Sequence, residues 1–362
     1  MKIKNIFFAA ILVLAGFSCS MEDDAIMNDV EKGIEEATEA YTVLDFGVAF
    51  NEMAKKASTT VVPGEDRPAT GDENNDEKKI SEVSVFLLED GKVIGILIPQ
   101  NRNQVSSNSD GSITLKDLKF VTKYKTNRTL DAHVVINGNQ FLKNINIGDA
   151  QSALNQQISG CLSADQLIKY GSTRIVFGKD ITNSYSSPSV AENNPTTILV
   201  KVSHVAARLD FSQFDVTLKG FEGNPTVVFD EAKFVNLQQN GKIVEGDASV
   251  NVKDGAFLNR SNRIGTRWTD MGTAYGYANQ YKQDSEMNTA LYVKFTVDGR
   301  TFEKTYPINP AGITKEVDHN GIKGGYLYDI KVRWTITPDW GDSTIEFYTR
   351  DWVHNSIPEI VL

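Results

Sequence analysis

Histidines and acidic residues are the side chains of this sequence that could bind a metal ion or transfer protons. The histidines are His133, His204, His319 and His354, and no two of them have the spacing of zinc ligands. Residues 72–76 match the first half of a calcium-binding loop, but Glu77 replaces its glycine and Val83 its bidentate glutamate. Acidic residues are numerous, yet nothing marks a pair with the separation that a glycosidase needs. Because a Gly-x-Ser-x-Gly motif and a glycine-rich phosphate loop are also absent, the sequence predicts no enzyme, no metal and no cofactor.

A group of aromatic residues could instead bind a sugar. Trp268, Tyr275, Tyr277 and Tyr281 lie in a stretch that also contains Gly265, Gly272 and Gly276. Exposed rings in a glycine-rich loop can stack on the flat faces of sugars. The alternative, which we favour, is that these rings pack against the second half of the chain or line an assembly surface.

Cys19 is the residue with the clearest chemical role, because it ends a secretory signal. Lys2 and Lys4 precede an apolar run over residues 6–15, which is too short to span a bilayer as a stable helix. A cysteine at the cleavage point resembles the lipobox of bacterial lipoproteins, although Gly16 stands where that motif usually has Leu or Val. The alternatives are an ordinary signal peptide with a chance cysteine, or an uncleaved anchor. We predict a lipoprotein signal peptide over residues 1–19 and a lipid on Cys19.

Composition narrows the class of the mature protein. The formal net charge of −10 argues against nucleic acid as a partner. The chain has only two cysteines, so Cys161 has no disulfide partner once Cys19 carries lipid. The 362 residues are suited to two domains, whose stability must come from packing and strand pairing.

The pattern of short apolar runs predicts an all-β protein with little helix. Residues 41–50 and 80–98 contain strand patterns, the latter a hairpin that turns at residues 89–92, and residues 196–214 read as one long strand. Helical spacing occurs only near residues 150–157 and 163–170. We predict an acidic tether over residues 20–40, a first β-sandwich over residues 41–194 and a second over residues 195–362.

Three segments together resemble the fimbrillin family, the fimbrial subunits of Bacteroidetes. The first is the lipobox followed by a strand, an Arg-bearing loop and the sequence Lys79–Phe86. The second is residues 202–211, and the third is residues 326–332 followed by a further strand, Asp351 and Trp352. The acidic group after Cys19 also resembles the surface-export signal of Bacteroidetes lipoproteins. The resemblance implies two tandem transthyretin-like Greek-key β-sandwiches and a place on the cell outer membrane, then in a surface fimbrium.

The resemblance also implies that a protease removes the first strand. In the family, an Arg-specific protease cuts the loop after that strand, which here is residues 41–50. The loop spans residues 57–79, and Arg67 is its only arginine. Pro68 follows Arg67, and trypsin-like proteases cut poorly before proline, so Lys56 and Lys79 are alternative cleavage sites. A solvated loop charge without any role is the other interpretation of Arg67.

The strand that replaces residues 41–50 would come from the C-terminal segment of a neighbouring subunit. Here that segment is residues 353–362, with apolar donor residues at Ile357, Ile360 and Leu362. Pro358 lacks an N–H group, so its ladder of hydrogen bonds would be incomplete. The alternative is a final strand that pairs within its own domain.

The sequence therefore predicts a fimbrial structural subunit, most readily of the stalk, that polymerises by donor-strand exchange and serves adhesion. Its partners would be copies of itself, tip and anchor subunits, a processing protease, the outer membrane through the lipid, and surface ligands of a host or of other bacteria. The alternatives are a tip or anchor subunit, or a monomeric surface lipoprotein that binds glycans through Trp268, Tyr275 and Tyr277.

Overall fold

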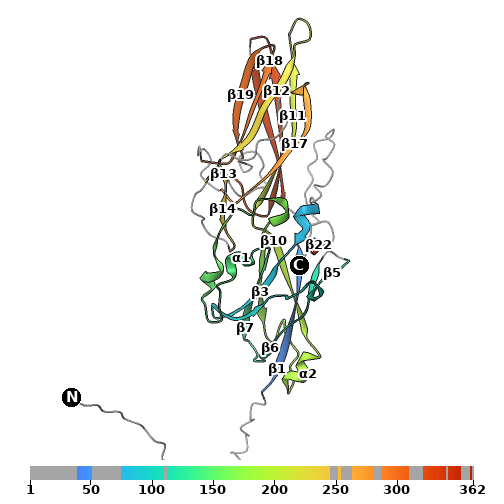
Figure 1. Ribbon diagram of the computed structural model, residues 1–362, viewed down its shortest axis with the longest axis vertical. Coiled ribbons are helices and arrows are strands. Elements are labelled where there is room, and N and C mark those ends of the chain that lie inside the picture. The colour runs from blue at the N-terminus through green and yellow to red at the C-terminus, as the bar shows by residue number, and fades with distance from the viewer. Residues whose placement is uncertain are drawn as a thin grey trace, which may run out of the picture. The chain divides into compact units, whose positions relative to one another are not determined.

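The computed structural model describes most of the chain after residue 38 (Figure 1). The described residues are 39–50, 75–109, 112–244, 252–253, 263–279, 287–309, 321–339, 341–351 and 359–360. Residues 39–362 form one compact unit. Strands make up most of the described chain, which confirms the prediction of an all-β fold with little helix.

An eight-stranded sheet contains most of the first half of the chain. Its spatial order is β4 (Lys92–Leu97), β3 (Val83–Glu89), β7 (Thr129–Ile136), β9 (Lys169–Val176), β10 (Thr196–His204), β1 (Tyr41–Phe50), β6 (Ile113–Lys123) and β5 (Val105–Ser107). The predicted hairpin is β3 and β4, and its turn residues Asp90 and Gly91 have φ angles of 49° and 72°, as a tight hairpin turn requires.

This sheet folds over on itself and encloses a core. Inward residues of β1, β6 and β10 belong to the same apolar cluster as those of β3, β7 and β9. The fold occurs where β9 meets β10, which pair only through Ser203 with Tyr170 and His204 with Lys169. A Cβ atom on Gly171 would lie 1.8 Å from the carbonyl oxygen of Lys201, so glycine is required for this close crossing.

Two four-stranded sheets in the second half of the chain form a sandwich. One has the order β17 (Arg267–Gly276), β11 (Ala207–Leu218), β20 (Tyr326–Ile336) and β21 (Gly341–Asp351), and the other β16 (Arg263–Ile264), β12 (Val227–Val235), β18 (Ala290–Val297) and β19 (Arg300–Pro307). Phe214 lies at the centre of their shared core. Its ring centroid is 5.3 Å from those of Phe229, Trp268 and Phe295.

The chain passes from the first sheet to the second between β10 and β11. The sequence predicted one strand over residues 196–214, but the structure divides it at Val205 and Ala206. The N–H of Val205 donates to the carbonyl of Ile168, whereas the carbonyl of Ala206 accepts from Gly325 in the second half. Val205 is therefore hydrogen-bonded to the first half of the chain and Ala206 to the second half. The division into domains at residue 194 stays a prediction.

Short elements complete the described fold. They are helices α1 (Asn139–Leu142) and α2 (Pro188–Glu192), the 3₁₀ turns η1 (Asn75–Lys78), η2 (Arg102–Gln104), η3 (Gln151–Leu154) and η4 (Ala164–Gln166), and the paired strands β13 (Leu237–Gln238) with β15 (Val252–Lys253), β14 (Asn240–Lys242) with β8 (Gln157–Ser159), and β2 (Lys79–Ile80) with β22 (Glu359–Ile360). The helical spacing near residues 150–157 and 163–170 thus gives only single 3₁₀ turns. Among the described residues, no helix has the length and apolar character needed to cross a membrane.

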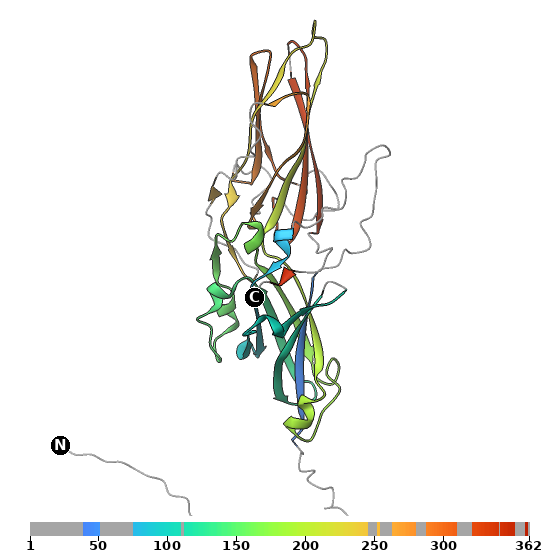
Figure 2. The same ribbon diagram turned by 45° about the vertical axis from the view of Figure 1, so that its right-hand side comes forward.

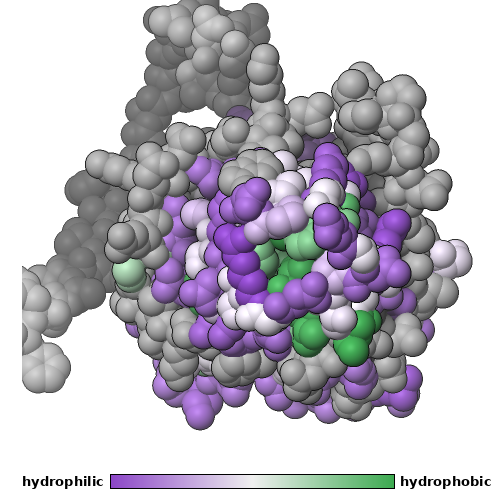
Figure 3. Space-filling model, turned by 90° about the horizontal axis from the view of Figure 1, so that it is seen from above, coloured by the Kyte–Doolittle hydropathy of each residue, from purple (hydrophilic) through white to green (hydrophobic). Residues whose placement is uncertain are grey.

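The core of the second sandwich reaches the surface at one end. Seen in space-filling form, apolar residues lie in a hollow surrounded by hydrophilic ones (Figure 3). Leu218, which ends β11, Phe221 in the following turn and Phe302 on β19 pack against the core while remaining partly exposed. The guanidinium of Arg300 spans this end, because it donates to the carbonyl of Pro338 and lies 5.0 Å from the Phe302 ring centroid.

The aromatic centre of the second sandwich predicts a large effect of truncation there. We expect Phe214→Ala to lower the free energy of unfolding by about 3–5 kcal/mol, because a cavity replaces a ring that touches three others. Urea unfolding followed by tryptophan fluorescence measures this loss. Ile264→Ala is the matched control, since Ile264 is 75% exposed. Equal losses in the two variants would contradict this account of the core.

Candidate functional site

The predicted removable strand, β1, lies in the interior of the eight-stranded sheet. It runs parallel to β10, where Phe46 is opposite Ile198, and antiparallel to β6, where Val48 is opposite Ile113. Figures 1 and 2 show β1, in blue, between these neighbours. Because both its edges are paired, taking β1 away would expose the N–H and C=O groups of two strands rather than one.

The inward face of β1 contributes four large side chains to the first core. Leu44, Phe46 and Val48 are fully buried and Phe50 is 5% exposed, and all four belong to one apolar cluster. Their spacing of two residues is that of one face of a strand. Burial of each contributes about 1.5–3 kcal/mol, so an empty β1 position would be an apolar groove that strongly favours refilling.

The opposite face of β1 is tight at one glycine. A Cβ atom on Gly47 would lie 3.2 Å from the Leu199 side chain and 3.3 Å from the carbonyl oxygen of Ile113. Leu199, on β10, is 52% exposed and lies across this position. Helix α2 also packs near β1, and Val43 is buried outside the core cluster.

The pairing of β1 with β6 is irregular next to Asp45. Leu44 is opposite Phe120 but Phe46 is opposite Leu115, so β6 carries extra residues here. The Asp45 carboxylate accepts a hydrogen bond of 2.9 Å from the N–H of Phe46. Burial raises the pKa of Asp45, although this hydrogen bond acts in the opposite direction.

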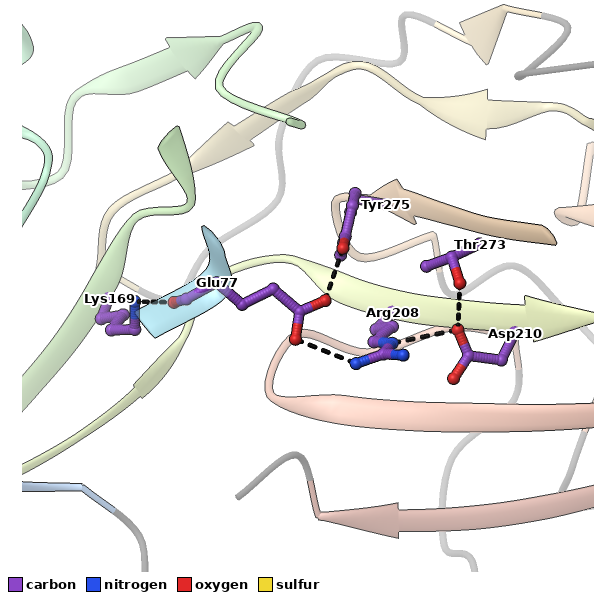
Figure 4. A network of polar contacts seen from close by, with 6 residues as sticks. All are labelled: Glu77, Lys169, Arg208, Asp210, Thr273 and Tyr275. Atoms are coloured by element: carbon purple, nitrogen blue, oxygen red, sulfur yellow. Dashed lines mark hydrogen bonds and ion pairs between the residues drawn. The ribbon is translucent and has the colours of Figure 1, made fainter. Parts of the chain in front are cut away.

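The end of the predicted cleavage loop, residues 57–79, is held by a buried polar network around Glu77 in η1 (Figure 4). The Glu77 carboxylate is fully buried and accepts from Arg208 at 2.9 Å and from the Tyr275 hydroxyl at 2.5 Å. The backbone carbonyl of Glu77 accepts from the buried Nζ of Lys169 at 2.8 Å. Lys169 belongs to the first sheet and Arg208 and Tyr275 to the second, so Glu77 connects both.

Further contacts fix the positive charge in this network. Arg208 also donates to Asp210 at 3.0 Å, and the Thr273 hydroxyl donates to the same carboxylate oxygen at 2.7 Å. Burial disfavours the charged form of Arg208, but the charges of Asp210 and Glu77 outweigh it and raise its pKa. Burial, followed by the Glu77 charge and hydrogen bond, raises the pKa of Tyr275 far above its ordinary value. Tyr275 therefore remains a hydrogen-bond donor at physiological pH.

The C-terminal strand β22 lies beside the residues that follow this network. It runs parallel to β2, with Glu359 opposite Lys79 and Ile360 opposite Ile80 (Figure 2). Ile80 is fully buried in the first core. Ile360, one of the predicted donor residues, therefore pairs within its own chain in this structure.

Of the other residues predicted to act in assembly, the structure describes only Lys79. Cys19, Lys56, Arg67, Ile357 and Leu362 lie outside the described residues. Lys79 is in β2, its Nζ is 2.7 Å from Asp76, and its carbonyl accepts from Asn137 at 2.9 Å.

Three of the predicted sugar-binding aromatics lie on or next to strand β17, not in a loop, and Tyr281 lies outside the described residues. Trp268 is 5% exposed and packs on Phe214, and Tyr277 is 1% exposed and donates to the carbonyl of Gly160. The Tyr275 hydroxyl donates a hydrogen bond to the Glu77 carboxylate. Their rings are thus committed to packing and hydrogen bonds, and a glycan role for Trp268, Tyr275 and Tyr277 remains a prediction without support from this packing.

Sequence reasoning missed the network around Glu77, and no local signal marks it. Its members are separated by up to 198 residues in the chain, and Glu77 lies at the end of a polar stretch typical of loops. The histidines do not form a site in the part that the structure describes. His133 is buried and its Nδ1 lies 2.8 Å from the Tyr170 hydroxyl, His204 is buried on β10, and no group of three metal-binding side chains occurs among the described residues.

The network predicts that η1 is anchored more firmly than its surroundings. We expect Glu77→Gln to lower the free energy of unfolding by about 1.5–3 kcal/mol, because the hydrogen bond to charged Arg208 loses its carboxylate acceptor. Asp76→Asn is the control, since its ion pair with Lys79 is exposed and contributes about 0–1 kcal/mol. Urea unfolding of both variants decides the point, and an equal effect would show that Glu77 does not anchor η1.

The sequence and the structure were compared with those of known proteins. No family model and no curated protein matches the sequence. The structure is similar to that of a protein from Parabacteroides distasonis that is provisionally assigned to cell adhesion, with 17% identity, a TM-score of 0.57 and coverage of 88% of this chain and 99% of the other. A fimbrilin from Porphyromonas gingivalis matches at 13% identity and a TM-score of 0.49, covering 88% and 99%, and a fimbrial assembly protein from P. distasonis at 16% and 0.46, covering 86% and 99%. At these identities the likeness concerns the fold, which this chain shares with the P. distasonis protein of TM-score 0.57.

Proposed function

We propose that this chain is a structural subunit of a cell-surface fimbrium, exported as a lipoprotein and joined to its neighbours by strand exchange. The observation that carries the proposal is the position of β1. It is the first described strand, it contributes four core side chains, and both of its edges are paired. The fold shared with the P. distasonis adhesion protein supports a surface role.

In this proposal β1 is a temporary strand. Lipid on Cys19 holds the subunit at the outer membrane while β1 fills the groove between β6 and β10. A protease then cuts the following loop, and β1 leaves with the acidic tether and the lipid. A strand from a neighbouring subunit enters the groove, where main-chain hydrogen bonds form the ladder and alternate side chains fill the core.

The contacts around η1 favour Arg67 or Lys56 over Lys79 as the cleavage site. A protease binds its substrate as an extended segment, but the backbone at Lys79 pairs with β22 and its carbonyl accepts from Asn137. Cleavage at Arg67 would leave Glu77 and its partners untouched, so the body of the subunit would keep its new N-terminal segment docked.

The C-terminal residues 353–362 are the proposed donor to the next subunit. Of this segment the structure describes Glu359 and Ile360, which pair with β2 of their own chain. In the proposal this pairing is given up when the segment joins a neighbouring subunit. A subunit that is both cut and able to donate lies within the fibre rather than at its lipid anchor.

N-terminal sequencing of protein sheared from the cell surface tests the cleavage. We expect the sheared subunit to begin after Lys56 or Arg67 and to lack β1. Arg67→Ala, or Lys56→Ala if sequencing places the cut there, should leave the longer form on the cell and abolish high-molecular-weight polymers. Arg102→Ala, in an exposed turn of the body, is the matched control. A sheared subunit that still begins at Cys19 would refute strand removal.

Metabolic labelling with a fatty acid tests the lipid. We expect label in the precursor, none in the sheared fibre, and none in Cys19→Ala, which should also fail to reach the surface. Label that persists in the fibre subunit would favour an anchor.

A further inference from the structure

The β1 groove imposes a pattern on the strand that fills it, and we infer that this strand comes from a polypeptide other than a second copy of this chain. The inference rests on the proposed strand exchange and names its partner. Four inward positions, one tight outward position and the direction of pairing define the pattern.

The inward positions require four large apolar side chains in alternation. Leu44, Phe46, Val48 and Phe50 together fill one side of the first core. A polar residue at any of these positions would be buried among apolar neighbours without a hydrogen-bond partner. A smaller residue would leave a cavity.

The outward position of Gly47 leaves little room for a side chain. A Cβ atom there would lie 3.2 Å from the Leu199 side chain and 3.3 Å from the Ile113 carbonyl oxygen, so a larger residue fits only if these neighbours shift by a few tenths of an ångström.

The neighbouring strands fix direction and register. A filling strand must run parallel to β10 and antiparallel to β6, and it must match two separate segments of β6 on either side of the irregularity at Asp45. A slip of one residue would turn the apolar face outward. A slip of two residues would bring a different residue under Leu199.

The C-terminal segment of this chain fails the pattern in every register. Residues 353–362 can cover positions 44–50 in four registers, which place Ser356, Ile357, Pro358 or Glu359 at the Gly47 position. In the first three, a histidine, asparagine or glutamate occupies an inward position.

The fourth register comes nearest to the pattern. It places Ser356, Pro358, Ile360 and Leu362 inward. Proline is tolerable at the Phe46 position, because the N–H of Phe46 donates to the side chain of Asp45. The remaining conflicts are Ser356 in place of the fully buried Leu44, and Glu359 under Leu199.

The partner that fits is therefore a strand of a different subunit, with large apolar residues at four alternate positions and a small residue between the second and third. This chain's own tail would then enter the groove of another kind of subunit. A fibre that contains this chain is accordingly built from more than one polypeptide.

Peptide exchange on the nicked full chain tests the inference. A protease site placed within residues 57–74 allows the chain to be cut while β1 stays in place. Isotope-labelled peptides then compete with β1, and intact mass measures the fraction exchanged. The peptides are residues 41–50, the same with Gly47→Val, residues 353–362, and the latter with Glu359→Gly.

We expect the 41–50 peptide to replace β1, and the Gly47→Val and 353–362 peptides to exchange at least about tenfold less, equivalent to 1.4 kcal/mol. Glu359→Gly should recover part of the loss in the tail peptide. Leu199→Ala in the protein should recover binding of the Gly47→Val peptide. If the unaltered tail exchanges as well as the 41–50 peptide, a second copy is the partner and the inference fails, while the proposed function stands. If the 41–50 peptide itself never replaces β1 in the nicked, folded protein, the proposed function fails with it.

Discussion

The pairing of both edges of β1 is the constraint on which the first half of the structure depends. An interior strand satisfies the backbone groups of two neighbours, and here it also supplies one side of the core. The folded body therefore cannot lose β1, the first described strand, without a substitute.

The network around Glu77 lies between β1, which leaves in the proposed assembly, and the body of the subunit, which remains. Upstream of η1 lie the loop and β1, and downstream lies Ile80, which is fully buried in the first core. Glu77 is bonded through its side chain to β11 and β17 and through its carbonyl to β9. A buried charge with a full set of partners is expensive to disturb, since each partner would be left unsatisfied. In the proposed assembly, cleavage of the loop upstream of η1 would change the occupant of the groove and leave the contacts of Glu77 intact.

The sequence predicted the fold class and the groove strand well, and the contacts around them poorly. The β-branched and aromatic residues of 41–50 and the turn at Asp90–Gly91 identified β1 and the β3–β4 hairpin from local pattern alone. The break at Val205 and Ala206 was missed, although the buried positions change there from even-numbered residues in β10 to odd-numbered residues at the start of β11. The tertiary partners of the two sides also differ. Strand β17 was taken for a loop because of its glycines, yet Gly276 is required by the close approach of the Leu237 side chain, at 2.5 Å from its Cβ position. The Glu77 network depends on pairs distant in sequence, which no local pattern can reveal.

Hydrophobic pattern and close packing have different roles in the groove. Apolar residues at the inward positions supply most of the free energy of filling, and many strands could provide them. Gly47 supplies little energy, but a larger residue at that register would require Leu199 or the Ile113 carbonyl to shift. Selection between partners is a difference of affinities, and one repulsive contact can decide it when the attractive contacts are similar. The order of subunits in a fibre would then be set at a position where the chain has no side chain at all.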